Sequence, residues 1–155
     1  MQITYLSYFL ASIIAYLGLL LGIILIRLAP EEQIPGKKYF ILLKKILFFI
    51  ILVSLLFFYK INVFLITIFL FFIIVLILNK KIKLEKSAFV YFLLGAVFYA
   101  SSKIFNLFVL ETLFIFLYGI VTSSIILNLK KRNYYDVFIK NLWFFIPIVI
   151  FYFIL

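Results

Sequence analysis

LAPEEQIPGKKYFILLKK, residues 28–45, is the longest break in a sequence that is otherwise almost continuously apolar. Pro30, Glu31 and Glu32 resemble the first turn of a short interfacial helix, because proline suits the first helical position and acidic groups suit the positive end of the helix dipole. Pro35 and Gly36 then mark a turn. Apolar runs flank the break on both sides, so it predicts the turn of a helical hairpin in a membrane.

The composition supports the same class of protein. Of the 155 residues, 69% are hydrophobic and 13% are charged, and the mean hydropathy is +1.37. A soluble domain has roughly 45–50% apolar and about 25% charged residues. The surplus cannot all be buried in one small core. We therefore expect an all-α, polytopic integral membrane protein, with residues 1–155 forming a single transmembrane domain.

The lengths of the apolar runs predict six transmembrane helices arranged as three hairpins. About 20 apolar residues cross a bilayer core of roughly 30 Å. The 33 residues from Ile46 to Leu78 are too many for one straight span, and their single charge, Lys60, marks a turn. Pro147 should weaken or kink the last span, since it has no N–H group. The expected spans are approximately residues 3–28, 39–59, 62–78, 87–104, 107–128 and 136–154.

The basic residues predict the orientation. Of the 15 Lys and Arg residues, 13 lie in the first, third and fifth turns, and Lys60 and Lys103 lie in the other two. Basic residues favour cytoplasmic loops. We expect a protein of the cell membrane, with both termini outside and the basic loops in the cytoplasm. The net charge of +10 is thereby explained by topology, so nucleic acid is not an expected partner.

Four lysines of the first turn, Lys37, Lys38, Lys44 and Lys45, share one helical face because they repeat with a spacing of seven. If the second span begins near Tyr39, Lys44 and Lys45 lie within it. Their side chains then either extend back to the headgroups or hold an anionic lipid phosphate beside Lys37 and Lys38. Anionic lipids at the cytoplasmic face are therefore expected contacts.

The first span carries a stripe of small residues spaced three or four positions apart. A stripe of this kind, including a GxxxG pattern, lets the backbone of another helix approach closely. It predicts helix packing rather than chemistry. Its members are Ser7, Ala11, Ala15, Gly18 and Gly22.

The sequence offers little for catalysis. It contains no His, no Cys and only five acidic residues, so we expect no metal site and no cofactor. Ser101 and Ser102 adjoin Lys103, but neighbouring residues on a helix point in different directions, which disfavours a Ser/Lys dyad. We expect the protein not to be an enzyme.

One polar group lies at the outer end of the fourth and fifth spans. Lys103 and Glu111 flank the same turn, so an ion pair that holds this hairpin is one expectation. The other is the mouth of a small polar site between the first, fourth and fifth spans, lined deeper by Tyr16 and Tyr118. The residues of the group are Ser101, Ser102, Lys103, Asn106, Glu111 and Thr112.

Two functions follow as hypotheses. The first is a subunit, scaffold or assembly factor of a membrane complex, which predicts a membrane-protein partner or a homo-oligomer. It rests on the stripe of the first span and the lack of catalytic residues. The alternative is a small transporter or channel for an ion, lipid or small molecule, which rests on Lys103, Glu111 and Pro147.

Overall fold

The computed structural model describes residues 4–61, 88–127 and 134–154, and within these ranges the chain is helical. The long helices follow from the unbroken apolar runs that the sequence provides. In chain order the elements are α1 (Tyr5–Leu28), the short 3-10 helix η1 (Pro30–Glu32), α2 (Gln33–Phe58), α4 (Ala88–Ser101), α5 (Phe105–Ile126), α6 (Tyr134–Ile139), the 3-10 helix η3 (Leu142–Phe144) and α7 (Phe145–Ile154).

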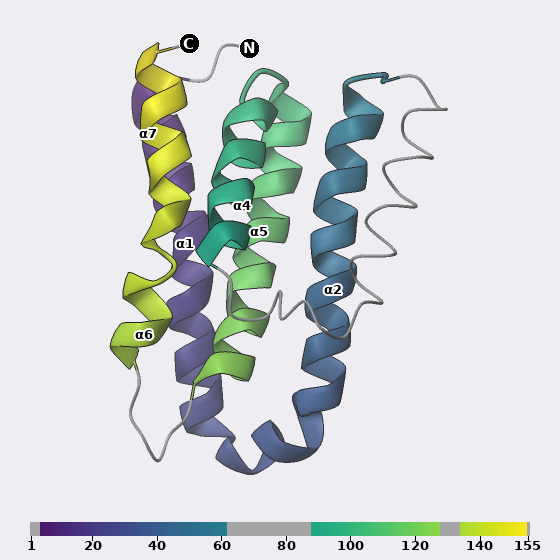
Figure 1. Ribbon diagram of the computed structural model, residues 1–155, viewed down its shortest axis with the longest axis vertical. Coiled ribbons are helices and arrows are strands. Elements are labelled where there is room, and N and C mark those ends of the chain that lie inside the picture. The colour runs from purple at the N-terminus through teal and green to yellow at the C-terminus, as the bar shows by residue number, and fades with distance from the viewer. Residues whose placement is uncertain (1–3, 62–87, 128–133, 155) are drawn as a thin grey trace.

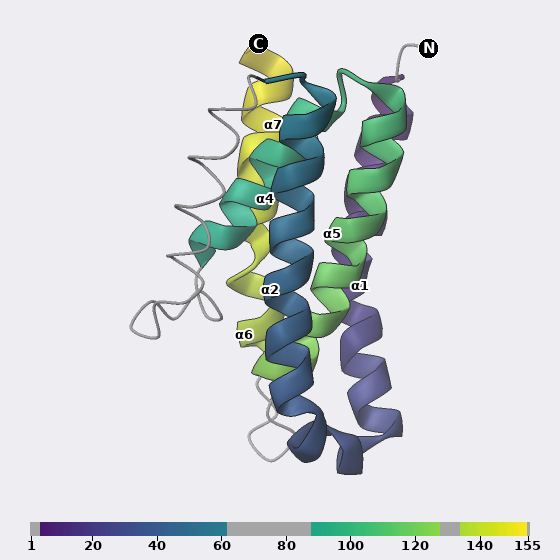
Figure 2. The ribbon, with the colours of Figure 1, turned by 90° about the vertical axis from the view of Figure 1, so that its right-hand side faces the viewer.

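Helix α5 is the centre of the arrangement. It packs along both α1 and α2, while α4 packs against η3 and α7 (Figures 1 and 2). The start of α1 and the end of α7 lie at one end of the bundle, together with the end of α2 and the turn between α4 and α5 (Figure 1). We call this the terminal end. The opposite end carries η1 and is called the Pro30 end.

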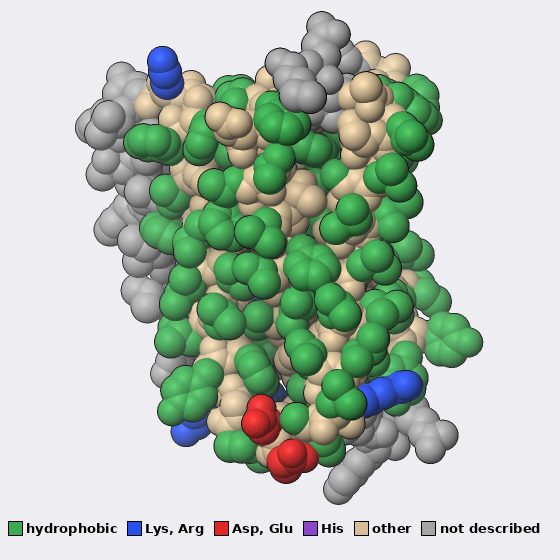
Figure 3. Space-filling model, turned by 180° about the vertical axis from the view of Figure 1, so that it is seen from behind, with side chains coloured by type: hydrophobic (Ala, Val, Ile, Leu, Met, Phe, Trp, Pro, Cys, Tyr) green, Lys and Arg blue, Asp and Glu red, His purple; other side chains and the backbone are tan. Residues whose placement is uncertain are grey.

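Four stretches of the described chain are long and apolar enough to cross a membrane: Tyr5–Leu28, Pro30–Phe58, Phe105–Ile126 and Val137–Ile154. Helix α4 is apolar but has only 14 residues. Apolar side chains cover most of the face shown in Figure 3, and the charged side chains visible on it lie near its two ends. The all-helical fold with membrane-length helices is thus confirmed.

The finer topology remains a prediction. The expected third span, residues 62–78, lies outside the described residues, as do most of the second and third basic loops. Within the described part, α5 packs on both arms of the first expected hairpin, α1 and α2. The count of six spans and the three-hairpin arrangement are therefore neither confirmed nor contradicted.

The start of α2 differs from expectation. The helix begins at Gln33 and runs through Pro35 and Gly36, so the predicted turn at these two residues is wrong. Pro35 is the third residue of α2, where backbone N–H groups have no partner within the helix, and its missing N–H therefore costs no hydrogen bond. Because of this early start, Lys44 lies about 17 Å along the helix rather than near its beginning.

The last expected span is interrupted before Pro147. Helix α6 ends at Ile139, and α7 begins at Phe145. Pro147 is the third residue of α7 and again breaks no intrahelical bond. The break is stabilised by the carbonyl of Phe138, which accepts hydrogen bonds from the backbone N–H of Asn141 at 3.0 Å and from the Tyr16 hydroxyl at 2.6 Å. The predicted weakening of this span is therefore present, on the N-terminal side of Pro147 and including Trp143.

The small-residue stripe of α1 packs against α5 in the same chain. A Cβ atom added at Gly18 would overlap the Phe116 carbonyl, and one added at Gly22 would overlap the Ile120 carbonyl. The Ser123 hydroxyl of α5 also donates to the Leu19 carbonyl of α1 at 2.7 Å. The buried members of the stripe are Ala15, Gly18 and Gly22, whereas Ala11 is half-buried and Ser7 is exposed.

Candidate functional site

Polar side chains lie buried along the contact between α2 and α5, which we call the α2–α5 seam. Glu111 belongs to the second turn of α5 and is 0% exposed. The Ser54 hydroxyl of α2 donates a hydrogen bond to Glu111 Oε1. Within the described chain, Glu111 Oε2 is buried without a hydrogen-bond partner. An unsatisfied buried acceptor costs about 1–3 kcal/mol, and more when it is charged, so this carboxyl group requires an explanation.

The hydroxyl of Ser54 has a choice of acceptors. Its oxygen lies 2.8 Å from the Ile50 carbonyl and 3.0 Å from the Ile51 carbonyl of its own helix, in addition to its contact with Glu111. A serine hydroxyl has one hydrogen to donate and two lone pairs that accept. Ser54 can therefore donate to Glu111, or it can donate to its own helix and accept from Glu111 when that carboxyl group is protonated.

A second polar group lies nearer the Pro30 end, about 10 Å from Glu111 along α5. Lys44 of α2 is 5% exposed, and its ammonium group lies 5.2 Å from the centre of the Tyr118 ring. The Tyr91 ring of α4 lies 5.9 Å from the Tyr118 ring, and the Thr122 hydroxyl adjoins both tyrosine hydroxyls. We call Lys44, Tyr91, Tyr118 and Thr122 the lysine cluster.

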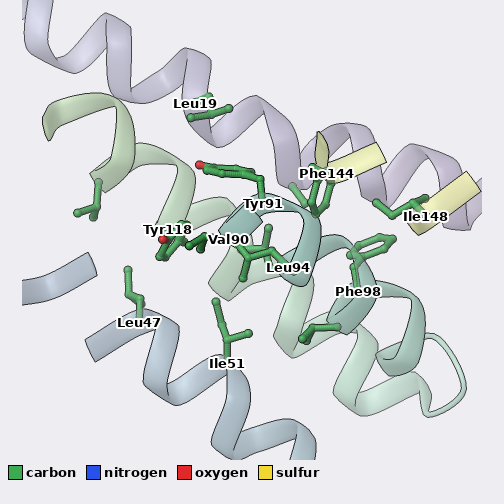
Figure 4. Close-up of a cluster of buried hydrophobic side chains, with 14 of the residues drawn as sticks. Leu19, Leu47, Ile51, Val90, Tyr91, Leu94, Phe98, Tyr118, Phe144 and Ile148 are labelled. Atoms are coloured by element: carbon green, nitrogen blue, oxygen red, sulfur yellow. The ribbon is translucent and has the colours of Figure 1, made fainter. Parts of the chain in front are cut away.

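Apolar side chains surround the lysine cluster. Figure 4 shows Tyr91 and Tyr118 with Leu47 and Ile51 of α2 and Val90 of α4. Thr122 and the two tyrosines are fully or almost fully buried. The hydroxyls of Tyr91 and Thr122 approach each other without a hydrogen bond of normal geometry in the described structure. The cluster thus holds a cation and hydroxyl groups in apolar surroundings, about two helical turns from Glu111.

Hydrogen bonds join the helices at both ends of the seam. At the Pro30 end, the Gln33 side-chain amide of α2 donates to the carbonyls of Leu127 at 2.6 Å and Ser124 at 3.2 Å. At the terminal end, the Tyr59 hydroxyl donates to the Ala100 carbonyl of α4 at 2.7 Å. Along α2, the polar side chains of the seam therefore lie between a contact with the end of α5 and a contact with α4.

The predicted ion pair of Lys103 with Glu111 is wrong. The described residues contain no such pair, since Glu111 contacts Ser54 and the Lys103 ammonium lies 5.5 Å from the centre of the Tyr99 ring. Lys103 is exposed in the turn, whereas Glu111 faces α2 from inside the bundle. The physical reason is that Glu111 lies two turns into α5, on the face that packs on α2.

The other members of the predicted polar group do not converge on Glu111. The hydroxyls of Ser101, Ser102 and Thr112 each donate to a carbonyl three or four residues earlier in the chain, at 2.6–2.7 Å. Asn106 is exposed. It is the second residue of α5, because this helix begins at Phe105 rather than at the expected residue 107. The Tyr16 hydroxyl donates to the Phe138 carbonyl, at the break after α6.

The four lysines expected to share a lipid-facing surface fall into different surroundings. Lys37 and Lys38 are exposed at the Pro30 end, Lys45 is half-buried and Lys44 is buried over Tyr118. The lipid-phosphate contacts remain a prediction. Lys44, however, turns into the bundle instead of extending back towards the headgroups.

The sequence analysis did not assign Ser54, Tyr91 or Thr122 to the candidate site. Ser54 is the one polar residue between Ile46 and Phe58, which was a signal for an inward-facing position. Tyr91 and Thr122 carry no comparable signal, because they lie among other aromatic and hydroxyl residues.

Comparisons of the chain with protein-family models, with curated proteins and with solved structures give no match. In the described residues, no three His, Cys, Asp or Glu side chains are grouped in a way that could hold a metal ion.

Proposed function

We propose that this chain is a small, non-enzymatic membrane transport protein and that its solute binds and moves along the α2–α5 seam. The observation that carries the proposal is the buried carboxyl group of Glu111, one oxygen of which has no hydrogen-bond partner in the described structure, on the same helix contact as the buried Lys44. Lys44 lies over Tyr118, whereas Glu111 contacts Ser54, about 15 Å farther along α2.

An unpartnered polar group in an apolar interior is costly, and Glu111 Oε2 has no hydrogen-bond partner in the described structure. Ionisable residues in the interior of membrane proteins are rare and usually mark a pathway for a solute or proton. The bridging contacts of Gln33 and Tyr59 at the two ends of the seam are suitable as gates, since each consists of side-chain hydrogen bonds that can open.

This proposal is preferred to the subunit hypothesis because of the α1 stripe. The stripe was the main sequence feature that suggested a partner helix. In the structure, α5 of the same chain packs against the buried members of the stripe. The described residues leave no comparable small-residue face that calls for a second protein.

We further propose that the protein lies in the cell membrane with its Pro30 end in the cytoplasm. Arg27, Lys37 and Lys38 lie at or near this end, whereas Lys60 and Lys103 lie at the terminal end. With this orientation, both termini are outside, and Lys37 and Lys38 lie near the anionic headgroups.

The test is electrical recording from the purified protein in vesicles adsorbed to a solid support. Rapid concentration jumps of sodium, potassium and ammonium chloride, and then of small organic acids and amines, would be applied. At least one jump should give a transient current. Lys44→Met should reduce that current about tenfold or more, because it removes the buried cation from the proposed pathway.

Lys38→Met is the matched control, because it makes the same chemical change at an exposed position of the same helix. It should leave the current unchanged. If every jump gives no current and native mass spectrometry finds a second protein bound in fixed proportion, the transport proposal is wrong and the subunit hypothesis takes its place.

A further inference from the structure

We propose that the Glu111 carboxyl is a proton-binding site through which a proton gradient drives transport. The inference rests on the proposed transport function. It deepens that function by naming the coupling ion, which is the proton.

The oxygen atoms around Glu111 favour a proton over a metal cation. Hard cations take about six or more oxygen ligands. In the described structure, one side-chain oxygen, that of Ser54, lies within hydrogen-bond distance of the carboxyl group, and Oε2 has no partner. A proton needs only a carboxyl oxygen to bind and one acceptor to hold it. The Glu111 site provides both.

Ser54 can serve both protonation states. When Glu111 is ionised, the Ser54 hydroxyl donates to Oε1. When a proton binds to Oε1, the new O–H group donates to the Ser54 oxygen, and the Ser54 hydrogen turns to the Ile50 carbonyl 2.8 Å away. One O–H bond to Glu111 forms, and the bond between the proton and its previous donor molecule breaks. Ser54 keeps a hydrogen bond to Glu111 in both states.

The titratable and charged groups on the surrounding elements already have other contacts. On α1, the Tyr8 hydroxyl donates to the Ile148 carbonyl at 3.3 Å. On α2, Lys44 lies with Tyr118, and the Tyr59 hydroxyl donates to Ala100. At the end of α4, Lys103 lies over Tyr99 in the turn that leads to α5, while Tyr91 belongs to the lysine cluster. In the described structure, none of these groups forms an ion pair with Glu111.

The position of Glu111 suits exchange of its proton with one side of the membrane. It lies about 9 Å from the start of α5, on the side of the terminal end. The contact between Tyr59 and Ala100 joins α2 to α4 at that end. Opening of this contact would bring water to Glu111 while the Gln33 bonds keep the Pro30 end closed.

The first experiment is infrared difference spectroscopy of the protein in lipid vesicles as the pH is stepped, with the proton itself as the probe. Each carboxyl group of the chain gives a C=O band when it is protonated, so the signal of Glu111 is the titrating band that is present in the wild type and absent from Glu111→Gln. Glu32→Gln, the matched control at an exposed glutamate, should retain that band.

Two further variants keep the test decisive if Glu111→Gln does not fold. Ser54→Ala should change the frequency of the band, because the carboxyl group loses its hydrogen-bond partner. Glu111→Asp should retain a titrating band, since it keeps the carboxyl group. A Glu111 band that is unchanged in Ser54→Ala, or a wild-type spectrum in which no titrating band depends on Glu111, would overturn the assignment.

The second experiment applies pH jumps to the supported membranes described above. The wild type should give a transient current from proton binding, and Glu111→Gln should reduce it about tenfold or more. Solute currents without a titrating band at Glu111 would overturn the proton site and leave the transport function standing. A titrating Glu111 without any solute current would overturn the transport function and, with it, the coupling role.

Discussion

The contact between α1 and α5 is the most directly testable feature of the fold, and Gly18→Ala is the change that tests it. The added Cβ would overlap the backbone carbonyl of Phe116, which has no rotamer through which to move away. Helices α1 and α5 would have to separate, and this would weaken the bond from Ser123 to Leu19.

The magnitude can be worked out against a matched change. In a helix, glycine to alanine gains up to about 1 kcal/mol of intrinsic helix stability. Overpacking costs about 1–3 kcal/mol, and a hydrogen bond between membrane helices is worth about 0.6 kcal/mol. At Gly36 the added Cβ meets only the movable ring of Phe40, at 2.9 Å. We expect Gly18→Ala to be less stable than Gly36→Ala by about 2–4 kcal/mol, or roughly 30-fold to 700-fold in the unfolding equilibrium.

The assay is reversible unfolding of the purified variants in mixed lipid–detergent micelles, with the free energy of unfolding measured for each. Gly119→Ala should be destabilised in the same way, because its Cβ would meet the backbone of Gly18 and Leu19. If Gly18→Ala proved as stable as the wild type, α1 and α5 would not be in backbone contact, and the reasoning about the stripe would be refuted.

Three other predictions can be checked with the same set of proteins. Ser123→Ala should cost about 0.6 kcal/mol and at most about 1.7 kcal/mol in the unfolding assay, whereas Ser124→Ala, whose hydroxyl bonds within its own helix, should change little. Tyr16→Phe should cost about 0.5–1.5 kcal/mol and speed amide hydrogen exchange in α6, because the break after that helix loses a donor. A cysteine at Lys44 should react slowly with a water-soluble maleimide and one at Lys38 rapidly, and equal rates would contradict the burial of Lys44.

The sequence was a good guide where a local rule decided the structure. The stripe of α1 identified its inward face, since close backbone approach requires small residues. It was a poor guide at the turn between α4 and α5, where Ser101, Ser102 and Thr112 lie near Lys103 in the chain. Serine and threonine in a helix commonly bond to a carbonyl of the preceding turn, and all three do so here. These residues are therefore close in the sequence but do not form a shared site with Lys103.

The contact of Ser54 with Glu111 shows the opposite case. These residues are 57 positions apart, and neither lies in a motif that points to the other. They meet because α5 packs along α2, and the helical rise brings this turn of α5 level with that turn of α2. No periodicity along either segment contains this information.

By itself, the sequence determined that the chain forms long apolar helices fit for a membrane. Apolar runs of this length cannot be buried in a small soluble core, and a helix satisfies its own backbone hydrogen bonds in lipid. Only the tertiary structure decided that α5 packs on both α1 and α2, that Lys44 turns inward and that Glu111 meets Ser54. The physical reason is that lipid tails are as apolar as leucine side chains. The sequence of a leucine-rich helix therefore gives little indication of which face contacts lipid and which face contacts another helix.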